Sequence, residues 1–563
     1  MGHRGLHSAE RVAEYTSAGQ WGDETMDGLF RARVAAAPGR LAVVDPANKA
    51  DLTGTPPRRL TWRELDEEVT GLADVLLSHG VGAGDVVGLQ MPNTVELVTA
   101  YLACWRLGAV VSPLPAQYRE HEVTELGRLA GFTAYLTVDR LGDRSPVREI
   151  CGVKDALPAL RTVFAYGEDL PEGVVAAVPV PGARERVEAY AAEHPADPND
   201  CVTICWTSGT ESTPKGVPRT HYDWLAICWA TVDAPRLTAD DVLLNPFPMV
   251  NMAGINGMFL PWLRVGGVLV QHHPFDLPTF LRQIAEEKAT YTVAPPALLS
   301  MLLARPELLA ATDLGSLRVL GSGSAPLPPA MVRGWQEKHG IGVINFFGSN
   351  EGIALLTDPH DVPDPEQRAR YFPRYGVPGV EWTSRVSKWV SVRLVDDATG
   401  KEVTEPGVPG ELRIKGPTIF PGYLGGANLA SPFDEDGYLR TGDVFEIAGE
   451  DGRFLRYVDR AKDLVIRGGM NIAPAELEDL LSAHPAVAEV SVVGYPDEIL
   501  GERVCAVVVP AEGAAPTLED LVSHLRDRRI ASFKLPERLE LRSSLPRNPI
   551  GKVLKRDLRE ELM

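Results

Sequence analysis

Cysteine is scarce in this sequence, and its spacing does not suit a metal site or a set of disulfides. Six cysteines are scattered over 563 residues, and no two of them form a C-x-x-C pair. Cys201 and Cys205 are close together, but no further histidine or cysteine follows them at a metal-binding distance. We therefore expect buried, reduced thiols, as is usual in cytoplasmic proteins.

Long apolar runs and an excess of basic charge are also missing. Segment 1–20 has no apolar core, which excludes a secretory signal, and no apolar run reaches the roughly 20 residues that cross a membrane. The formal net charge is −20, which argues against a nucleic-acid-binding protein because such a protein needs a basic face. The sequence predicts a cytoplasmic protein, in which a local basic patch for an anionic cofactor is still permitted.

The chain is an ordinary globular sequence in composition, and its length predicts several structural units. In segment 60–115, helical and strand patterns alternate. Thr61 is the expected N-cap of a helix, with Glu64 completing a capping box. The same alternation returns in segment 266–320, including a helix from Leu277 to Lys288. This pattern predicts an α/β fold with parallel sheets that are covered by helices on both faces.

The remaining segments differ in character. Glycine, proline and short β runs in residues 376–445 predict a small β unit on a large N-terminal domain, 1–459. Residues 460–563 predict a smaller, mobile α+β C-terminal domain. Residues 140–200 show no clear periodicity, and we expect irregular structure there.

One loop is rich in small hydroxyl residues. It follows the apolar run 201–205 and reads Trp-Thr-Ser-Gly-Thr-Glu-Ser-Thr-Pro-Lys-Gly over residues 206–216. Such a loop can direct backbone N–H groups and hydroxyls toward a polyphosphate, although it lacks the Walker A pattern. Alone, the loop fits a phosphate site and a polar surface turn equally well.

Four later segments carry further candidate groups. They are an aromatic and glycine loop with a carboxylate at 346–352, an acidic turn at 438–443, a charged and glycine-rich stretch at 459–472, and a lysine loop at 546–552. An aromatic ring can stack on a purine, and a carboxylate can hold Mg²⁺ or a ribose. Taken singly, each of these segments fits an ordinary turn or a solvated charge.

Together these segments resemble the adenylate-forming superfamily of acyl- and aryl-CoA synthetases, adenylation domains and luciferases. The resemblance covers about residues 25–560, and six motifs stand in the family's order. They are the loop ending in Pro214-Lys215-Gly216, the aromatic-Gly-x-x-Glu loop at 347–351, Gly410-Glu411-Leu412 with Gly422-Tyr423, Thr441-Gly442-Asp443, Arg460 to Gly469, and Gly551-Lys552.

The resemblance implies ATP, Mg²⁺ and coenzyme A as cofactors, and a role for each matching residue. Lys552 would be the catalytic lysine, Lys462 the hinge, and Glu351 the Mg²⁺ ligand. The nucleotide would contact Thr207, Ser208, Gly209, Thr210, Glu211, Ser212, Lys215, Gly323, Asn345, Phe347, Asp443 and Arg460. The acid would contact Asn251, Met252, Ile255, Gly321, Gly348 and Asn350, and Gly468 with Gly469 would line the CoA tunnel.

Several positions depart from the family pattern. Glu211 and Ser212 stand where Thr and Gly are usual, and Asn350 replaces the usual Thr before the metal-binding Glu. Asn251 stands where His is frequent, and Met252 stands where salicylate ligases carry Asn, although segment 218–221 resembles those ligases. The mainly apolar pocket residues favour a bulky hydrophobic acid.

The resemblance favours an ATP-dependent acid–CoA ligase. One alternative is an acyl- or aryl-AMP ligase that loads a carrier protein in trans, because no carrier domain follows Lys552. A second is a nucleotide-binding homologue without catalysis, which the departures at Glu211 and Asn350 motivate. The expected partners are a small carboxylic acid and, in the alternative, a carrier protein; a homodimer is compatible with either.

Overall fold

The structure is a computed structural model. It describes residues 3–180, 182–207, 214–396, 398–425, 431–460, 463–467, 470–497, 500–528, 530, 534–547 and 553–562. The chain forms two compact units. The first contains Met1–Ser391 and Lys415–Gly437, and the second contains Val392–Ile414 and Tyr438–Met563.

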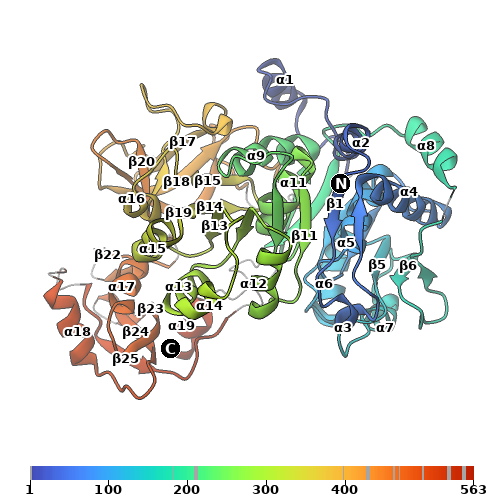
Figure 1. Ribbon diagram of the computed structural model, residues 1–563. Coiled ribbons are helices and arrows are strands. Elements are labelled where there is room, and N and C mark those ends of the chain that lie inside the picture. Colours follow the sequence, from blue (N-terminus) through green and yellow to red (C-terminus); the bar gives the residue numbers. More distant parts are fainter. Residues whose placement is uncertain are drawn as a thin grey trace. The chain divides into compact units, whose positions relative to one another are not determined.

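The first unit contains a sheet of seven strands in the order β7-β6-β5-β3-β4-β8-β9. Two of its neighbouring strands, β5 and β6, are labelled in Figure 1. Its strands are β3 (Val86–Leu89), β4 (Val110–Pro113), β5 (Ala134–Val138), β6 (Thr162–Tyr166), β7 (Val175–Ala176), β8 (Cys201–Thr207) and β9 (Lys215–Thr220). All neighbours are parallel except β8 and β9, which pair antiparallel. Every residue of β3, β4 and β5 is buried, as expected for strands whose two faces are both covered.

A second sheet of the same unit has eight strands in the order β15-β14-β13-β12-β10-β11-β1-β2. They are β1 (Leu41–Val44), β2 (Arg59–Thr61), β10 (Val242–Asn245), β11 (Val268–Gln271), β12 (Tyr291–Val293), β13 (Val319–Gly323), β14 (Gly342–Ser349) and β15 (Ile353–Thr357). The strands at the two ends, β2 and β15, are antiparallel to their neighbours, and the others are parallel. The predicted α/β fold with parallel sheets is confirmed.

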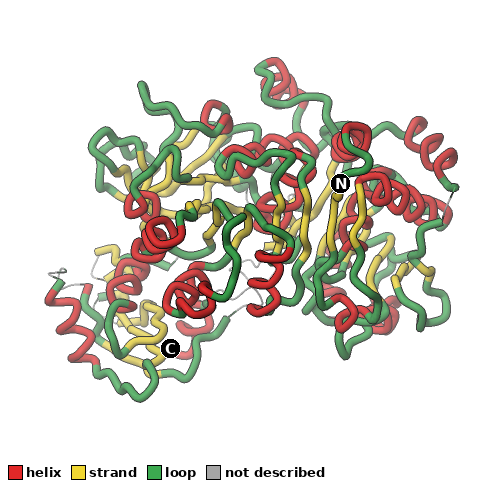
Figure 2. The backbone as a smooth tube through the Cα atoms, in the orientation of Figure 1, coloured by secondary structure: helices red, strands yellow, loops and turns green. Residues whose placement is uncertain are grey.

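Helices accompany both sheets (Figure 2). They are α1 (Ala9–Ser17), α2 (Met26–Ala36), α3 (Lys49–Thr53), α4 (Trp62–Ser78), α5 (Val95–Arg106), α6 (Glu120–Ala130), α7 (Pro146–Val153), α8 (Arg184–Glu193), α9 (His221–Asp233), α10 (Met252–Gly254), α11 (Leu260–Val265), α12 (Leu277–Glu286), α13 (Pro296–Ala304), α14 (Pro306–Ala310), α15 (Pro329–His339) and α16 (Pro365–Arg370). Short 3-10 turns lie at Lys154–Ala156 and Arg385–Lys388, a π-helical turn at Ile255–Phe259, and strand β16 at Tyr371–Pro373. The predicted capping box at Thr61 and Glu64 is present at the start of α4.

The expectation of irregular structure in residues 140–200 is wrong. This segment contains α7, α8 and the parallel strands β6 and β7. Val163, Phe164 and Ala165 are buried at the centre of β6, where both of its faces are covered. A strand buried on both faces does not alternate apolar and polar residues, which explains why periodicity failed to predict it.

The described residues of the second unit form two small sheets and three helices. The strands β17 (Ser391–Val395), β18 (Pro409–Lys415), β19 (Leu439–Ala448) and β20 (Phe454–Arg460) run in the order β20-β19-β18-β17. The second sheet contains β21 (Val465–Arg467), β22 (Met470–Ile472), β23 (Val487–Asp497), β24 (Gly501–Pro510) and β25 (Arg538–Leu541). The helices are α17 (Pro474–Ser482), α18 (Leu518–Asp527) and α19 (Lys555–Leu562), and α17 and α18 pack on a core that includes Val465, Leu477 and Leu521.

The two compact units are defined by how densely their residues contact one another. Such a division does not show which part of the chain moves as a separate domain. The expected boundary between residues 459 and 460, the β-rich subunit 376–445 and the mobility of the C-terminal domain therefore stay predictions. Among the described residues, no helix combines the length and apolarity that a membrane crossing requires. All six cysteines are unpaired; five are buried as expected, whereas Cys151 is only half-buried.

Candidate active site

The hydroxyl-rich loop connects two antiparallel strands. Strand β8 ends at Thr207 and β9 begins at Lys215, and these two residues are partners in the ladder. The Thr207 hydroxyl donates to the Lys215 carbonyl at 3.4 Å. Because the ladder fixes both ends of the loop, it holds its first and last residues in place. Residues 208–213, which include the predicted contacts Ser208, Gly209, Thr210, Glu211 and Ser212, lie outside the described residues.

Three predicted motifs meet near Lys215. The Lys215 ammonium lies 5.4 Å from the centroid of the Tyr423 ring, a distance at which cation–π attraction acts. The Tyr423 hydroxyl donates to the Glu351 carboxylate at 2.9 Å. We call Lys215, Tyr423 and Glu351 the phosphate-loop cluster. It combines a cation, a carboxylate and a phenol, which are groups suited to a phosphate that binds with a divalent metal ion.

A close backbone approach fixes Glu351. The loop that carries Tyr423 passes directly against the β14–β15 turn, where the Phe420 N–H donates to the Glu351 carbonyl at 2.9 Å. The next residue, Gly352, has φ of 110°, and a Cβ at this position would lie 2.0 Å from the Thr418 carbonyl oxygen. Only glycine fits both constraints, so Gly352 permits the contact that places Tyr423 on Glu351.

Asn350 joins three elements with one side chain. Its amide oxygen accepts from the Met252 N–H at 2.7 Å, and its amide nitrogen donates to the Trp206 carbonyl at 3.4 Å. These partners lie at the start of α10 and near the end of β8. Asn350, which the sequence marks as a departure from the family pattern and as a predicted acid contact, therefore connects a predicted acid-pocket segment to the strand before the phosphate loop.

The predicted acid-pocket residues occupy the α10 segment and the neighbouring strands. The Asn251 side chain caps α10, and its amide oxygen accepts from the Ala253 and Gly254 N–H groups at 3.0 and 3.4 Å. Met252 is half-buried, and its Cγ lies 3.8 Å from the Cβ position of Gly348. Ile255, by contrast, is 1% exposed.

Glycines on β13 make room for Phe346. A Cβ on Gly321 would lie 2.7 Å from the Phe346 ring, and one on Gly323 would lie 2.5 Å from the Phe346 carbonyl oxygen. The following ring, Phe347, is half-buried and lies 5.6 Å from the Phe372 ring, measured between centroids. The two glycines thus allow β13 and β14 to pair closely, which fixes the strand that carries Phe347.

Asn345 has a structural task in this strand. It is 2% exposed, and its amide nitrogen donates to the carbonyls of Arg368 and Ala369 at 3.1 and 3.0 Å. Both amide hydrogens are therefore used by the protein. Its predicted contact with adenine stays a prediction, and it could involve only the amide oxygen.

A buried charge network supports the cluster, and sequence reasoning missed it. The Arg219 guanidinium donates to the Asn350 carbonyl at 2.7 Å and to the Thr418 carbonyl at 3.0 Å, and it pairs with Asp223. Asp223 also accepts from His7 Nε2 at 3.1 Å. Burial opposes the charge on Asp223, but Arg219 and His7 outweigh it, and the pKa of Asp223 lies below its ordinary value. The motif Pro-Arg-Thr-His at 218–221 was the available signal.

The second unit holds the acidic turn predicted to bind ribose. Asp443 is 3% exposed on β19, and its N–H donates to the Thr441 hydroxyl at 3.1 Å. Glu411 accepts from the Gly442 N–H at 3.1 Å, where Gly442 has φ of 68°. The motif Gly410-Glu411-Leu412 therefore shapes this turn from the neighbouring strand. Asp443 is paired in register with Arg460, whose side chain lies outside the described residues.

Besides the residues of the hydroxyl-rich loop, four further predicted site residues cannot be placed. Lys462, Gly468, Gly469 and Lys552 lie outside the described residues, and their roles stay predictions.

Known proteins match this chain along most of its length. Residues 30–424 match the family model of the AMP-binding enzyme, and residues 476–552 match that of the AMP-binding enzyme C-terminal domain. The chain is 34% identical to indoleacetate–CoA ligase of Aromatoleum aromaticum over 90% of this chain and 94% of that protein. It is 31% identical to salicyl-AMP ligase / salicyl-S-ArCP synthetase of Mycobacterium tuberculosis over 98% and 94%.

Solved structures show the same fold. The crystal structure of ATP-bound MatB from Rhodopseudomonas palustris superposes with a TM-score of 0.76 at 29% identity, covering 96% of this chain and 99% of that one. Family models match most of the chain, and full-length relatives exceed 30% identity. The protein therefore belongs to the AMP-binding enzyme family of adenylate-forming ligases.

Proposed function

We propose that the protein is an ATP-dependent carboxylic acid–CoA ligase. In the first half-reaction, the acid's carboxylate oxygen attacks the α-phosphorus of ATP, which gives acyl-AMP and releases pyrophosphate. In the second half-reaction, the CoA thiol attacks the acyl carbonyl, which gives the thioester, AMP and a proton. The phosphate-loop cluster is the observation that carries this proposal, because it joins three motifs from distant parts of the sequence at one place.

We assign the nucleotide contacts by their chemistry. Thr207, Lys215 and the loop between them would hold the β- and γ-phosphates, Phe347 would stack on adenine, and Asp443 with Arg460 would bind the ribose. In each half-reaction two anions or dipoles must approach each other, so fixed donors stabilise the transition state. Lys552 would neutralise the approach of the carboxylate to the α-phosphate, and Lys462 would be the pivot that exchanges Lys552 for the Gly468–Gly469 tunnel.

Glu351 fits a Mg²⁺ ion. Magnesium prefers oxygen ligands and commonly takes one or two carboxylates together with substrate phosphates. The Glu351 carboxylate is half-buried, and one of its oxygens is oriented by the Tyr423 hydroxyl. A bound Mg²⁺ would neutralise phosphate charge. The protein's own part is to hold the Glu351 side chain in one orientation.

An apolar acid of some bulk suits the residues around α10. Met252 and Gly348 are neighbours, and Met252 is a flexible apolar side chain that adapts to different shapes. Ile255 and Gly321 are buried, and they would set the depth of the acid site. Asn350 would position the Met252 backbone at the edge of the acid site.

A pyrophosphate-release assay with a panel of carboxylic acids tests the function. We expect ATP-dependent release that requires an added acid, with medium- to long-chain fatty, polycyclic and substituted aromatic acids as the panel. Release that does not depend on any acid would contradict the proposal.

The acceptor is decided by a second assay. Enzyme loaded with acyl-AMP is mixed with CoA or with a phosphopantetheinylated carrier protein, and the acylated product is identified by mass. We expect CoA to be acylated. Exclusive acylation of the carrier would favour the alternative AMP ligase, for which the salicyl-AMP ligase relative is the support. A cytoplasmic location and a homodimer complete the proposal, and fractionation and analytical ultracentrifugation measure them.

A further inference from the structure

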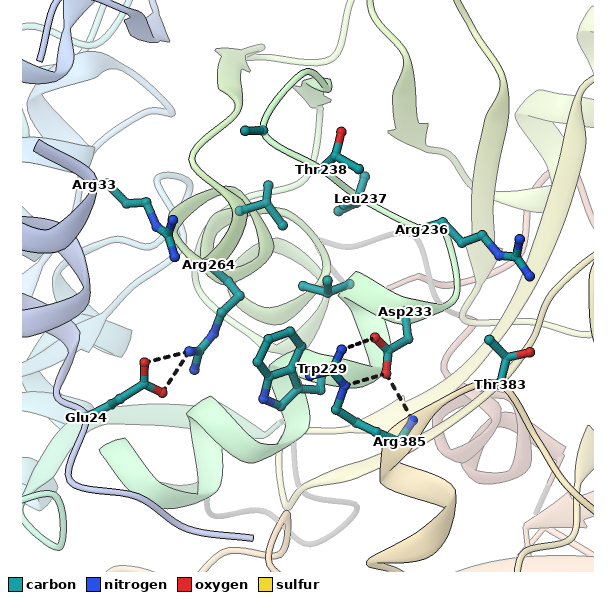
Figure 3. Close-up of a pocket in the computed structure, with 13 residues that line it drawn as sticks. Glu24, Arg33, Trp229, Asp233, Arg236, Leu237, Thr238, Arg264, Thr383 and Arg385 are labelled. Carbon is teal, nitrogen blue, oxygen red and sulfur yellow. Dashed lines mark hydrogen bonds and ion pairs between the residues drawn. The ribbon is translucent and has the colours of Figure 1, made fainter. Parts of the chain in front are cut away.

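A cavity in the first unit is lined by residues at the C-terminal end of α9, among them Trp229 and Asp233 (Figure 3). Its volume is about 730 Å³, which is within the range of small-molecule sites. Helix α9 has 13 residues and is therefore about 20 Å long. Its first residue, His221, comes two residues after Arg219, which donates to the Asn350 carbonyl. Its last residue, Asp233, lines the cavity, so the cavity and the Arg219 contact lie near opposite ends of the helix.

The cavity has an excess of positive charge. Four arginines and two carboxylates line it, which leaves two positive charges without a matching carboxylate. Glu24 pairs with Arg264 at 2.7 Å, and Asp233 pairs with Arg385 at 3.1 Å. Among the residues that the structure describes, Arg33 and Arg236 have no ion pair. The lining residues with charge are Glu24, Arg33, Asp233, Arg236, Arg264 and Arg385.

Arg264 is the centre of the arrangement. Its side chain is 6% exposed, and its Nε and Nη2 atoms are buried without a hydrogen-bond partner in the described part of the chain. The nearby Cys228 thiol does not compensate the charge, because burial raises its pKa to about 12 and the thiol is neutral. A buried guanidinium with two unused donors is costly unless an acceptor reaches it.

A second guanidinium lies close to Arg264. Figure 3 shows Arg33 and Arg264 on the same side of Trp229. Burial lowers the pKa of Arg33, and the Arg264 charge lowers it further. The Arg33 Nε is also buried without a partner among the described residues. Two close guanidinium groups repel each other, and their unused donors lack acceptors. An anion between them offsets the repulsion and accepts hydrogen bonds from those donors.

Phosphate matches this geometry better than a single-charged anion. Near neutral pH a phosphate monoester carries close to two negative charges and three acceptor oxygens, whereas guanidinium groups present forked donors. Trp229 cannot serve as a free stacking face for a ligand, because Arg385 and Arg264 lie 3.5 and 4.7 Å from its ring centroid. The apolar residues Val232, Leu237 and Val265 also line the cavity, and they suit a small organic body.

From these contacts we infer that the cavity binds a small organic phosphate, with its phosphate group between Arg33 and Arg264. The site is separate from the ATP site and does not depend on the proposed ligase activity. Arg264 supplies Nε and Nη2, and Arg33 supplies a second guanidinium. The apolar wall covers part of the organic group.

Binding of phenyl phosphate, followed by ³¹P line broadening at low salt, tests this inference. Arg33→Gln should weaken binding roughly tenfold or more, because it removes a charge-assisted contact. Glu24→Gln should strengthen binding, because it frees Arg264 Nη1 from its carboxylate. Lys215→Gln, in the phosphate-loop cluster, should leave binding unchanged. Inorganic phosphate should bind more weakly than phenyl phosphate, since it leaves the apolar wall uncovered.

Arg33→Gln and Glu24→Gln are expected to change the affinity for phenyl phosphate in opposite directions. Equal binding to the wild type and to Arg33→Gln would overturn the inference, as would loss of binding in Lys215→Gln, which would place the probe at the ATP site. Equal affinity for phenyl phosphate and inorganic phosphate would overturn the inference that the apolar wall binds an organic group. Should Arg33→Gln not fold, Glu24→Gln still decides, because Glu24 is 52% exposed and tolerates the change; binding that is not tighter in this variant contradicts the site.

Discussion

The Tyr423 hydroxyl donates a hydrogen bond of 2.9 Å to the Glu351 carboxylate, although 72 residues separate them in the chain. This contact joins the Gly-Tyr motif to the aromatic-Gly-x-x-Glu motif. It leaves the carboxylate in one orientation, beside a ring that Lys215 also approaches. Tyr423, which the sequence marks only as part of the Gly-Tyr motif, therefore orients the Glu351 carboxylate.

Tyr423→Phe should slow adenylate formation while preserving the fold. A hydrogen bond to a charged group contributes about 1.5–3 kcal/mol, so kcat for pyrophosphate exchange should fall roughly 10- to 100-fold. More Mg²⁺ should also be needed for half-maximal activity. Tyr190→Phe is the matched control, because it removes a hydroxyl on α8 that accepts from the Ala83 N–H and belongs to none of the predicted motifs. Equal activity of the two variants would refute the role of Tyr423.

Asn350→Ala should act mainly on the acid. The change removes the acceptor of the Met252 N–H and the donor to the Trp206 carbonyl. We expect the KM for the carboxylic acid to rise roughly tenfold, which corresponds to one lost hydrogen bond, with a smaller change in the KM for ATP. Steady-state kinetics with each substrate varied in turn measures both. A larger effect on ATP would place Asn350 in phosphate binding instead.

The fold and the motif positions could be predicted from the sequence to a large extent, because they depend on local signals. The capping box at Thr61 and the apolar strands of both sheets are such signals. Strand β6 was missed because a strand buried on both faces shows no alternation. The links Asn350–Met252 and Arg219–Thr418 were missed because they depend on segments that only the tertiary fold brings together.

His221 should make stability depend on pH. It is fully buried, its Nδ1 accepts from the Met26 N–H at 3.0 Å, and burial lowers its pKa from 6.5 to about 3. Between pH 6.5 and about pH 3, His221 is protonated in the unfolded chain but neutral in the folded protein. The free energy of unfolding therefore falls as the pH decreases through this range. The slope contributed by this one group is about 1.4 kcal/mol per pH unit.

His221→Asn isolates this contribution. The Asn side-chain oxygen can replace Nδ1 as the acceptor for Met26, yet it does not titrate. Urea unfolding from pH 7 to pH 4 should therefore show a shallower loss of stability in the variant than in the wild type. Identical slopes would show that His221 titrates in the folded protein as it does in the unfolded chain.

Gly469→Tyr should separate the two half-reactions. A bulky side chain in the proposed tunnel should obstruct the pantetheine thiol without touching the α-phosphate. Pyrophosphate exchange should stay near the wild-type rate. Thioester formation should fall roughly tenfold or more, because the thiol could no longer reach the acyl carbonyl in a reactive orientation. Single-turnover measurements of both halves give the comparison, and an equal loss in both would contradict a tunnel at this position.

Lys552→Ala gives the most direct test of the central claim, that this chain joins a carboxylic acid to AMP with Lys552 at the reacting phosphate. Acid-dependent ATP–pyrophosphate exchange should fall roughly 100- to 1,000-fold, as for other lost transition-state contacts. Lys555→Ala, which removes a lysine paired with Glu478 at 2.9 Å, should retain the exchange rate. An unchanged rate in Lys552→Ala, measured with an acid that the wild type activates, would contradict the account.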